Sequence, residues 1–176
     1  ITASNVHKLL VSESQKNSLI YEKCKPLTIE HHNYFANANN SRQWGIIYEP
    51  LSIKIYEKLY QTKVEDFGCI QHPKYKCIGA SPDGINIDPT SGRFGRMIEV
   101  KDIVNRDITG IPKEEYWIQM QLQMETCDLD FCDFFECEID EFETEQQFVE
   151  QIIDMSYQAK GIIFQIENSG PDPKFI

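Results

Sequence analysis

Apolar side chains recur at helical spacing in one long stretch, from Ser41 to Tyr60. Their positions follow the i, i+3, i+4 and i+7 repeat of a single helix face. Ser41 is a residue type that caps helix starts, whereas Pro50 removes a backbone N–H from the interior. The pattern therefore predicts a helix over these residues that kinks or restarts at Pro50.

Shorter helical patterns precede this stretch. Val6 and Leu9 have helical spacing after Thr2 and Ser4, either of which could cap a short helix. A hydroxyl at a helix start can instead hold a phosphate, because free N–H groups and the helix dipole favour an anion, but capping is the commoner use. Residues 13–40 predict a helix followed by an irregular connection.

A helix is also predicted from Pro112 to about Cys127, since proline is favoured in a first helical turn. Polar and apolar residues alternate in the middle of this segment, a pattern that would suit a strand as well. Thr144 is expected to cap a final helix through about Lys160, before a loop at residues 169–173.

Strand patterns occupy the rest of the chain. Alternation and turn residues predict strands or hairpins over residues 64–70, 75–80, 81–101 and 131–139. Together with the helices, they predict an α/β fold with a central mixed β-sheet flanked by α-helices. At 176 residues, the chain is most simply one domain over residues 1–176.

The composition is that of a globular protein, with 41% hydrophobic and 26% charged residues. No run of about 18 apolar residues occurs, so no membrane-spanning helix is expected. The sequence begins at Ile1 without a methionine or a signal-peptide pattern, and we therefore expect an excerpt or a processed chain.

The six cysteines form no CxxC pair, which favours reduced thiols in an intracellular, reducing compartment. Cys127, Cys132 and Cys137 are spaced five apart, but on a strand Cys132 and Cys137 face opposite sides, which disfavours a metal cluster. The adjacent His31 and His32 would diverge on a helix, so no metal site is expected there.

The net charge of −11 argues against broad, non-specific nucleic-acid binding, which depends on lysine and arginine neutralising phosphates. A nucleic-acid partner would require the basic residues to gather locally. Those in or near the central segments are Lys74, Lys76, Arg93, Arg96 and Arg106.

The hairpin over residues 81–101 carries the densest candidate chemistry. On a strand, Glu99 and Lys101 lie on one face, while Val100 points to the other. The hairpin turn brings Asp83 back beside Glu99. Two carboxylates and one ammonium group would then share a sheet edge.

Oxygen ligands of this kind suit Mg²⁺, which is held by few carboxylates and keeps several waters. A lysine beside the ion can help to deprotonate or orient water and can offset charge on phosphorus. The pattern therefore indicates metal-assisted phosphodiester hydrolysis. Asp-Gly, Ser-Pro and Glu-Val-Lys also occur in ordinary turns and edge strands, so the hairpin alone also suits a non-catalytic role.

Two residues outside the hairpin are further candidates. Glu49 lies beside the apolar stripe and could lean into the site as a metal or water ligand, or remain a solvated helix carboxylate. Gln119 shares a helix face with Tyr116 and Gln123. It could orient a water or be a half-exposed surface residue.

Five short motifs occur in order along residues 1–125. They are Ile1-Thr2-Ala3-Ser4, Trp44-Gly45 with Tyr48-Glu49, Ser81-Pro82-Asp83-Gly84, Glu99-Val100-Lys101, and Tyr116 with Gln119-Met120-Gln121. Each is weak alone, but with them the chain resembles the lambda-exonuclease and YqaJ-like viral recombinase family of the PD-(D/E)xK nuclease superfamily, in its large-DNA-virus and phage form. The resemblance implies a restriction-endonuclease-like core.

The resemblance also implies roles for particular residues. Those that would bind Mg²⁺ or Mn²⁺, two ions to a site, are Asp83, Glu99, Glu49 and the backbone carbonyl of Val100. Lys101 would activate or position the attacking water, and Gln119 would hold Lys101 or that water. Ser4 and Ser81 would contact a terminal 5′-phosphate, and the family's phosphate-binding arginine lies upstream of Ile1.

As a whole, the resemblance implies a Mg²⁺-dependent deoxyribonuclease. It would be an exonuclease that degrades one strand of duplex DNA, 5′-to-3′, in viral recombination, replication or repair. A homotrimer, a single-strand annealing protein as partner, no membrane, and a location in the host cytoplasm or nucleus are implied as well. The alternatives are a non-catalytic nuclease-fold module that binds DNA ends or a protein, which the acidic net charge favours, and an endonuclease of the same superfamily.

Overall fold

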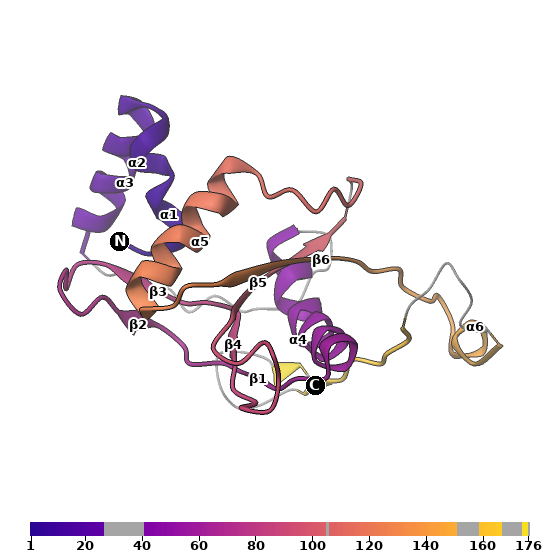
Figure 1. Cartoon of the computed structure of the whole chain (residues 1–176). Coiled ribbons are helices and arrows are strands. Elements are labelled where there is room, and N and C mark those ends of the chain that lie inside the picture. Colours follow the sequence, from indigo (N-terminus) through magenta and orange to yellow (C-terminus); the bar gives the residue numbers. More distant parts are fainter. Residues whose placement is uncertain (27–40, 105, 151–158, 167–173, 176) are drawn as a thin grey trace.

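The computed structural model describes residues 1–26, 41–104, 106–150, 159–166 and 174–175. His31 and His32, the irregular connection expected after the first helices and the loop expected at residues 169–173 lie outside the described residues. Figure 1 shows a sheet in the middle of the molecule, with helix α4 on one side of it and helix α5 on the other.

The helices are α1 (Ala3–Val6), α2 (Lys8–Val11), α3 (Glu13–Cys24), α4 (Ser41–Tyr60), α5 (Glu114–Cys127) and α6 (Glu145–Glu150). The strands are β1 (Val64–Glu65), β2 (Ile70–Gln71), β3 (Gly79–Ala80), β4 (Gly84–Asn86), β5 (Met97–Ile103), β6 (Cys132–Glu138), β7 (Gln165–Ile166) and β8 (Lys174–Phe175).

The central sheet has the order β1-β4-β5-β6. Strands β1, β4 and β5 are antiparallel neighbours, whereas β6 runs parallel to β5 along its whole length. The parallel pair is connected through α5, as expected for a strand, crossover helix and strand. The predicted mixed sheet flanked by helices is therefore confirmed.

Successive side chains of β5 point to opposite faces of the sheet, one towards α4 and the other towards α5. Ile98 and Val100 are buried against α4, where they pack with Tyr56. Glu99 is also fully buried, but it faces α5 and is hydrogen-bonded by two glutamines of that helix. The strand thus contributes an apolar core on one face and the candidate chemistry on the other.

Helix α4 has the predicted bounds, but it runs unbroken through Pro50. The expectation of a restart at this residue is therefore wrong. A proline inside a helix removes one hydrogen bond and costs about 3 kcal/mol. Tyr48 before it and Tyr56 after it are both buried, so tertiary packing on both sides of Pro50 stabilises one continuous helix.

The strand expected over residues 64–70 is instead two short strands in two different sheets. β1 pairs with β4 of the central sheet, and β2 pairs with β3 in a two-stranded sheet. Between them, Asp66 Oδ1 accepts the N–H of Gly68, which has a φ of +62°. This left-handed turn redirects the chain. The strand expected over residues 75–80 is likewise reduced to Gly79–Ala80.

Helix α5 resolves the ambiguity between helix and strand in favour of the helix. Glu114 and Glu115 lie in its first turn, where acidic side chains complement the helix dipole. At the other end, Asp128 adopts a left-handed conformation with a φ of +55°, and its N–H donates to Met124 O. These end signals outweigh the alternation in the middle.

The N-terminal helices are short, and Thr2 does not cap α1 with its side chain. Its Oγ1 instead accepts a hydrogen bond from Asn5 Nδ2 at 2.9 Å. The expectation of a side-chain cap from Thr2 is therefore wrong. The side-chain cap lies instead at Ser12, the N-cap of α3, whose side chain accepts from Gln15 N, 3.2 Å away.

The predicted cap at Thr144 is confirmed, since its Oγ1 accepts the N–H of Gln147 at 3.2 Å. Helix α6 is described to Glu150, and the next part of the predicted helix, residues 151–158, lies outside the described residues; Lys160 itself is not helical. Strands β7 and β8 form a small antiparallel pair that no pattern predicted. No helix in the described residues is long and apolar enough to cross a membrane.

Candidate active site

Asp83 lies directly before β4, where the hairpin brings it against β5. Its Oδ2 accepts the backbone N–H of Val100 at 2.6 Å. The next residue, Gly84, pairs with Ile98, and a Cβ on it would lie 2.2 Å from a methyl group of Val64. Glycine therefore permits the close approach of β1 that holds this end of β4 in position.

Glu99 is completely buried, with 0% of its surface exposed, and both of its carboxylate oxygens are hydrogen-bonded. Oε1 accepts from Lys101 Nζ and from Gln119 Nε2, the latter at 2.8 Å. Oε2 accepts from Gln123 Nε2 at 2.9 Å. A buried carboxylate needs such donors, because an unpaired charge is very costly in the interior.

Gln123 is the clearest site residue that the sequence analysis did not select. It is 1% exposed, and its Nε2 also lies 3.3 Å from the carbonyl of Ser81. One side chain therefore links the Asp83 loop to the Glu99 strand. The available signal was its position four residues after Gln119, which places both glutamines on one helix face.

Lys101 occupies the same face of β5 as Glu99, as the alternation predicted. Besides Glu99, its Nζ donates to the backbone carbonyl of Val100 at 3.0 Å, and it lies 5.0 Å from the centre of the Tyr116 ring. Burial lowers the pKa of this amine, but the carboxylates of Glu99 and Asp83 outweigh burial and raise it. Lys101 is therefore held in its charged form.

Glu49 projects from α4 towards the same cluster. Burial first, and then the charges of Asp102 and Glu99, raise its pKa to about 7. Asp102 was not selected from the sequence, although it is a polar residue on the otherwise apolar face of β5. Burial raises its pKa to about 6, while a hydrogen bond from Ser52 and the charge of Lys101 oppose that rise.

The cluster has an excess of negative charge that a cation would relieve. Burial, Glu99 and Glu49 raise the pKa of Asp83 well above its usual range, despite the nearby Lys101. Among the described residues, no three carboxylate, thiol or imidazole groups converge into a metal cage. The donors of the cluster are nevertheless all oxygens, and Mg²⁺ is typically held by one or two carboxylates and several waters. The residues therefore fit a hard divalent ion.

The two serines lie in segments that pair with each other. Thr2 forms a parallel bridge with Gly79. Ser4 lies two residues after Thr2, and Ser81 lies two residues after Gly79. Both serines are exposed, and Ser4 Oγ is 3.1 Å from Thr2 Oγ1. The fold thus brings the first and third motifs together.

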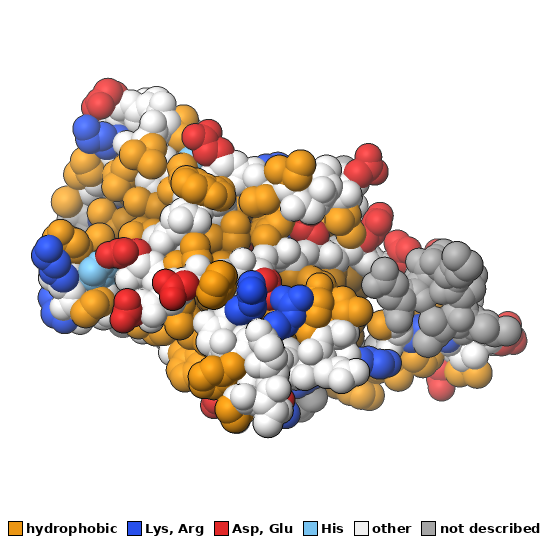
Figure 2. All heavy atoms as spheres, viewed as in Figure 1, with side chains coloured by type: hydrophobic (Ala, Val, Ile, Leu, Met, Phe, Trp, Pro, Cys, Tyr) orange, Lys and Arg blue, Asp and Glu red, His pale blue; other side chains and the backbone are white. Residues whose placement is uncertain are grey.

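The five basic residues expected to gather are dispersed among several contacts. Lys74 lies over the Tyr75 ring, and Arg106 forms an ion pair with Glu136. Only Arg93 and Arg96 share a partner, Asp133. On the face shown in Figure 2, basic side chains form separate groups rather than one continuous stripe.

Asp83, Glu99 and Lys101 lie on the two central strands or directly beside them, so the expected position at a sheet edge is wrong. A mixed sheet between two helices, with an aspartate, a glutamate and a lysine brought together in this way, is the arrangement of a restriction-endonuclease-like nuclease core. The sequence matches the family model described as "YqaJ-like viral recombinase domain" over residues 1–130. The chain belongs to this family, as its motifs indicated.

Two solved structures are similar to this chain. An alkaline exonuclease from Laribacter hongkongensis (LHK-Exo) has a TM-score of 0.59 and 26% sequence identity, over 78% of this chain and 69% of that chain. Its complex with dAMP has a TM-score of 0.58 and 27% identity, over 77% and 68% of the two chains.

A sequence relative is "Uncharacterized protein R354" of Acanthamoeba polyphaga mimivirus, which is 33% identical over 117 residues. That match covers 60% of this chain and 21% of the mimivirus protein. The chain therefore spans about a fifth of the length of this relative.

Proposed function

We propose that this chain is a divalent-metal-dependent DNA exonuclease that hydrolyses duplex DNA from its ends, 5′-to-3′, in viral DNA recombination, replication or repair. The observation that carries the proposal is the meeting of β4 and β5, where Asp83 accepts the Val100 N–H and Lys101 pairs with Glu99. LHK-Exo supports it, because dAMP is the kind of mononucleotide that exonucleolytic DNA hydrolysis releases.

The residues that would hold the metal are Asp83, Glu99, Glu49 and the carbonyl oxygen of Val100. A bound Mg²⁺ or Mn²⁺, one or two per site, would supply Lewis-acid stabilisation of the phosphoryl oxygens and an activated water. Carbonyl and carboxylate oxygens have more than one lone pair, so the hydrogen bonds already present on Val100 O and Glu99 leave capacity for a further partner.

Lys101 would act as a fixed positive charge. Since the surrounding carboxylates raise its pKa, it would remain protonated and donate hydrogen bonds. It could thereby orient the attacking water and stabilise negative charge that develops on the phosphorus oxygens. Gln119 would support this role by holding the Glu99 oxygen to which Lys101 also donates.

Ser4 and Ser81 would bind a terminal 5′-phosphate. Their support is the bridge between Thr2 and Gly79, which brings the two serine segments together. A 5′-phosphate held there would place a DNA end, rather than an internal bond, at the site.

The remaining parts of the proposal concern the wider setting. We assign residues 1–176 to one nuclease domain and expect a homotrimer that acts beside a single-strand annealing protein. The six unpaired thiols favour a reducing compartment, such as the cytoplasm or nucleus of a host cell.

The test is a cleavage assay with linear duplex DNA, with and without a 5′-phosphate, beside closed circular DNA, in Mg²⁺, Mn²⁺ and EDTA. Metal-dependent loss of linear DNA alone, with mononucleotides released first from the 5′ end and faster with the phosphate, is expected. Asp83→Asn should reduce the rate by about two orders of magnitude or more. The matched control is Asp88→Asn in the same hairpin, where Asp88 accepts hydrogen bonds from Thr90.

Each other result has a definite meaning. Cutting of the circle would make the protein an endonuclease of the same superfamily. No cleavage in either metal, with a normal cooperative melting transition, would contradict hydrolysis and favour a DNA-end-binding module. Equal losses in Asp83→Asn and Asp88→Asn would contradict the site.

A further inference from the structure

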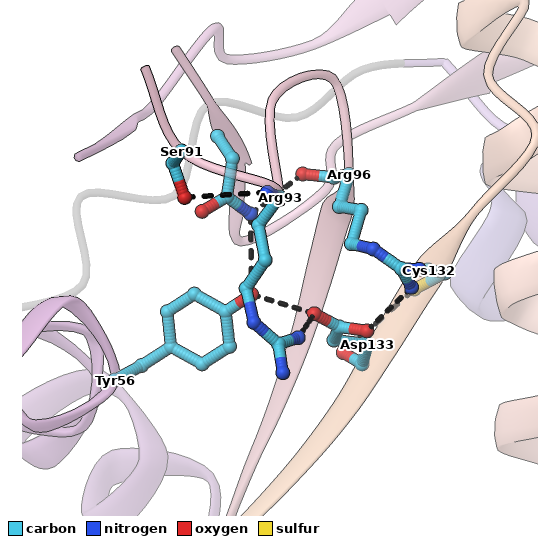
Figure 3. Close-up of polar contacts among 7 residues, drawn as sticks. Tyr56, Ser91, Arg93, Arg96, Cys132 and Asp133 are labelled. Carbon is cyan, nitrogen blue, oxygen red and sulfur yellow. Dashed lines mark hydrogen bonds and ion pairs between the residues drawn. The ribbon is translucent and has the colours of Figure 1, made fainter. Parts of the chain in front are cut away.

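A second polar site lies at the tip of the β4–β5 hairpin, away from the carboxylate cluster. It is a cavity of about 450 Å³, which we call the hairpin cavity. Its lining residues are Tyr60, Ser91, Gly92, Arg93, Arg96 and Asp133. Figure 3 shows the side chains of both arginines directed towards Asp133 of β6.

The hairpin cavity has an excess of positive charge. Asp133 accepts from Arg93 Nη1, from Arg96 Nη1 at 3.1 Å and from Tyr56 Oη at 2.6 Å. Two guanidinium groups therefore share one carboxylate, in a protein whose net charge is −11. The hydrogen bonds to Asp133 engage one nitrogen of each guanidinium, and a guanidinium has five N–H donors. Donor capacity is left for an anion.

Both arginines are held in position before any ligand arrives. The Arg93 guanidinium lies 3.5 Å from the centre of the Tyr60 ring, and that of Arg96 lies 4.6 Å from the centre of the Phe131 ring. The Arg96 carbonyl also accepts from Asn86 Nδ2 at 2.8 Å. The arginine side chains nevertheless remain 29% and 32% exposed. Preorganised donors of this kind bind with a small loss of conformational entropy.

The shape and chemistry of the hairpin cavity select among anions. Guanidinium forks match the oxygens of phosphate groups, and guanidinium planes and tyrosine rings stack on nucleobases. A volume of about 450 Å³ exceeds that of a single phosphate and falls in the range of ligand sites. Stacking requires a base that is not enclosed in a duplex. We propose that the hairpin cavity binds one strand of single-stranded DNA, with a phosphodiester group on Arg93 and Arg96 and a base on the Arg93–Tyr60 stack.

The hairpin cavity and the candidate active site lie on opposite faces of the sheet. Asp133 pairs opposite Ile98 and accepts from Tyr56 of α4, whereas Glu99 faces α5. Arg96 directly precedes β5, and Glu99 follows three residues later. The choice of DNA rests on the proposed function, whereas the phosphate and base chemistry rests on the cavity alone.

The test measures binding without cleavage. Fluorescein-labelled 20-nucleotide thymidine single strands, and a duplex of equal length, are titrated with the protein in EDTA at several salt concentrations. Arg93→Ala/Arg96→Ala should weaken single-strand binding at least tenfold and reduce the slope of log K against log salt by about 0.7, the value for the loss of one phosphate contact.

The matched control removes two positive charges elsewhere, in Lys54→Ala/Lys63→Ala. Lys54 pairs with Glu57 on α4, and both lysines lie outside the lining of the hairpin cavity. This variant should change affinity less than twofold. Arg93→Lys/Arg96→Lys keeps the charge and an ion pair with Asp133 but loses the planar forks, and it should weaken binding three- to fivefold. Thermal melts establish that each variant is folded.

Three results would overturn the proposal. They are unchanged affinity in the folded alanine variant, equal losses in the alanine variant and the lysine control, and duplex binding that falls as much as single-strand binding. Cleavage measured separately in Mg²⁺ keeps the two proposals apart. A protein that does not cut DNA but shows the expected binding losses would contradict only the nuclease function.

Discussion

The carboxylate cluster and the hairpin cavity have charge excesses of opposite sign, although both involve the β4–β5 hairpin. In the carboxylate cluster, Glu99 pairs with one lysine whose charge also acts on Asp83 and Glu49, and burial raises the pKa values of Asp83 and Glu49. In the hairpin cavity, two arginines surround one aspartate, and both arginines are partly exposed to water. The first region has capacity for a cation and the second for an anion.

Burial makes the two regions unequal in their sensitivity to change. Glu99 is 0% exposed, so water cannot readily replace a hydrogen-bond donor that is removed, and the buried carboxylate is left with fewer partners. Around Arg93, water can replace a lost partner, and the interactions are weakened by solvent screening. Substitutions should therefore have large effects in the carboxylate cluster and graded effects in the hairpin cavity.

The largest effect is expected from Lys101→Ala. Loss of the charge that is fixed beside Glu99 should reduce single-turnover cleavage by about 10² to 10³, the magnitude typical of losing one electrostatic donor. Lys54→Ala is the control, because Lys54 also pairs with a glutamate, 2.7 Å away, but on the exposed surface of α4. Full Mg²⁺-dependent cleavage by Lys101→Ala would refute the mechanism.

Gln123→Leu should have the next largest effect. It removes the donor to Glu99 Oε2 and the link to the Ser81 carbonyl, and it should lower the free energy of unfolding by about 1–3 kcal/mol. The control is Gln121→Leu, at an exposed position on the same helix. Its free energy of unfolding, measured by urea denaturation, should differ from that of wild type by about 0.5 kcal/mol or less. Similar losses in both variants would mean that Gln123 acts only through helix propensity.

These two regions also differ in how far the sequence predicts them. The face shared by Glu99 and Lys101 follows from period-two alternation, and the return of Asp83 follows from the hairpin turn, so local rules suffice. The family motifs add Glu49 and Gln119. Gln123 was missed because a glutamine on a half-polar helix gives no sign of its burial, which depends on how α5 lies against β5.

The hairpin cavity could not be predicted, because its parts are far apart in sequence. Asp133 is 40 residues from Arg93 and 77 residues from Tyr56. They meet only because β6 pairs with β5 in a register that places Asp133 opposite Ile98. The sequence also did not predict that residues 64–71 divide between two sheets, for a related reason. The turn at Gly68 is a local signal, but the direction in which it sends the chain depends on tertiary pairing.

The pH dependence of stability should also distinguish the two regions. Glu49 and Asp102 have folded-state pKa values of about 7 and about 6, raised by burial, so the folded protein retains protons that the unfolded chain releases. In EDTA, stability should therefore fall as the pH rises from about 5 to 8. Glu57 and Asp88, whose pKa values are lowered, give the opposite trend only at more acidic pH.

Urea denaturation at pH 5, 6, 7 and 8 measures this trend. Glu49→Gln and Asp102→Asn should each flatten the decline, because neither amide titrates. Mg²⁺ should stabilise the protein more at pH 8 than at pH 5, since metal binding requires ionised carboxylates. Stability that rises with pH in EDTA would show that the carboxylates are not crowded as described.

The smallest effect is expected from the ring beneath Arg93. Tyr60→Leu removes the surface on which the guanidinium lies, whereas Tyr60→Phe keeps it. A partly exposed contact between a cation and an aromatic ring contributes about 0.5–1 kcal/mol, so the leucine variant should lose about that much stability and bind single-stranded DNA about two- to fivefold more weakly. The phenylalanine variant should match wild type in both measurements. If leucine and phenylalanine behave alike, the ring neither positions Arg93 nor stacks on a base, and the ion pair with Asp133 alone holds the arginine.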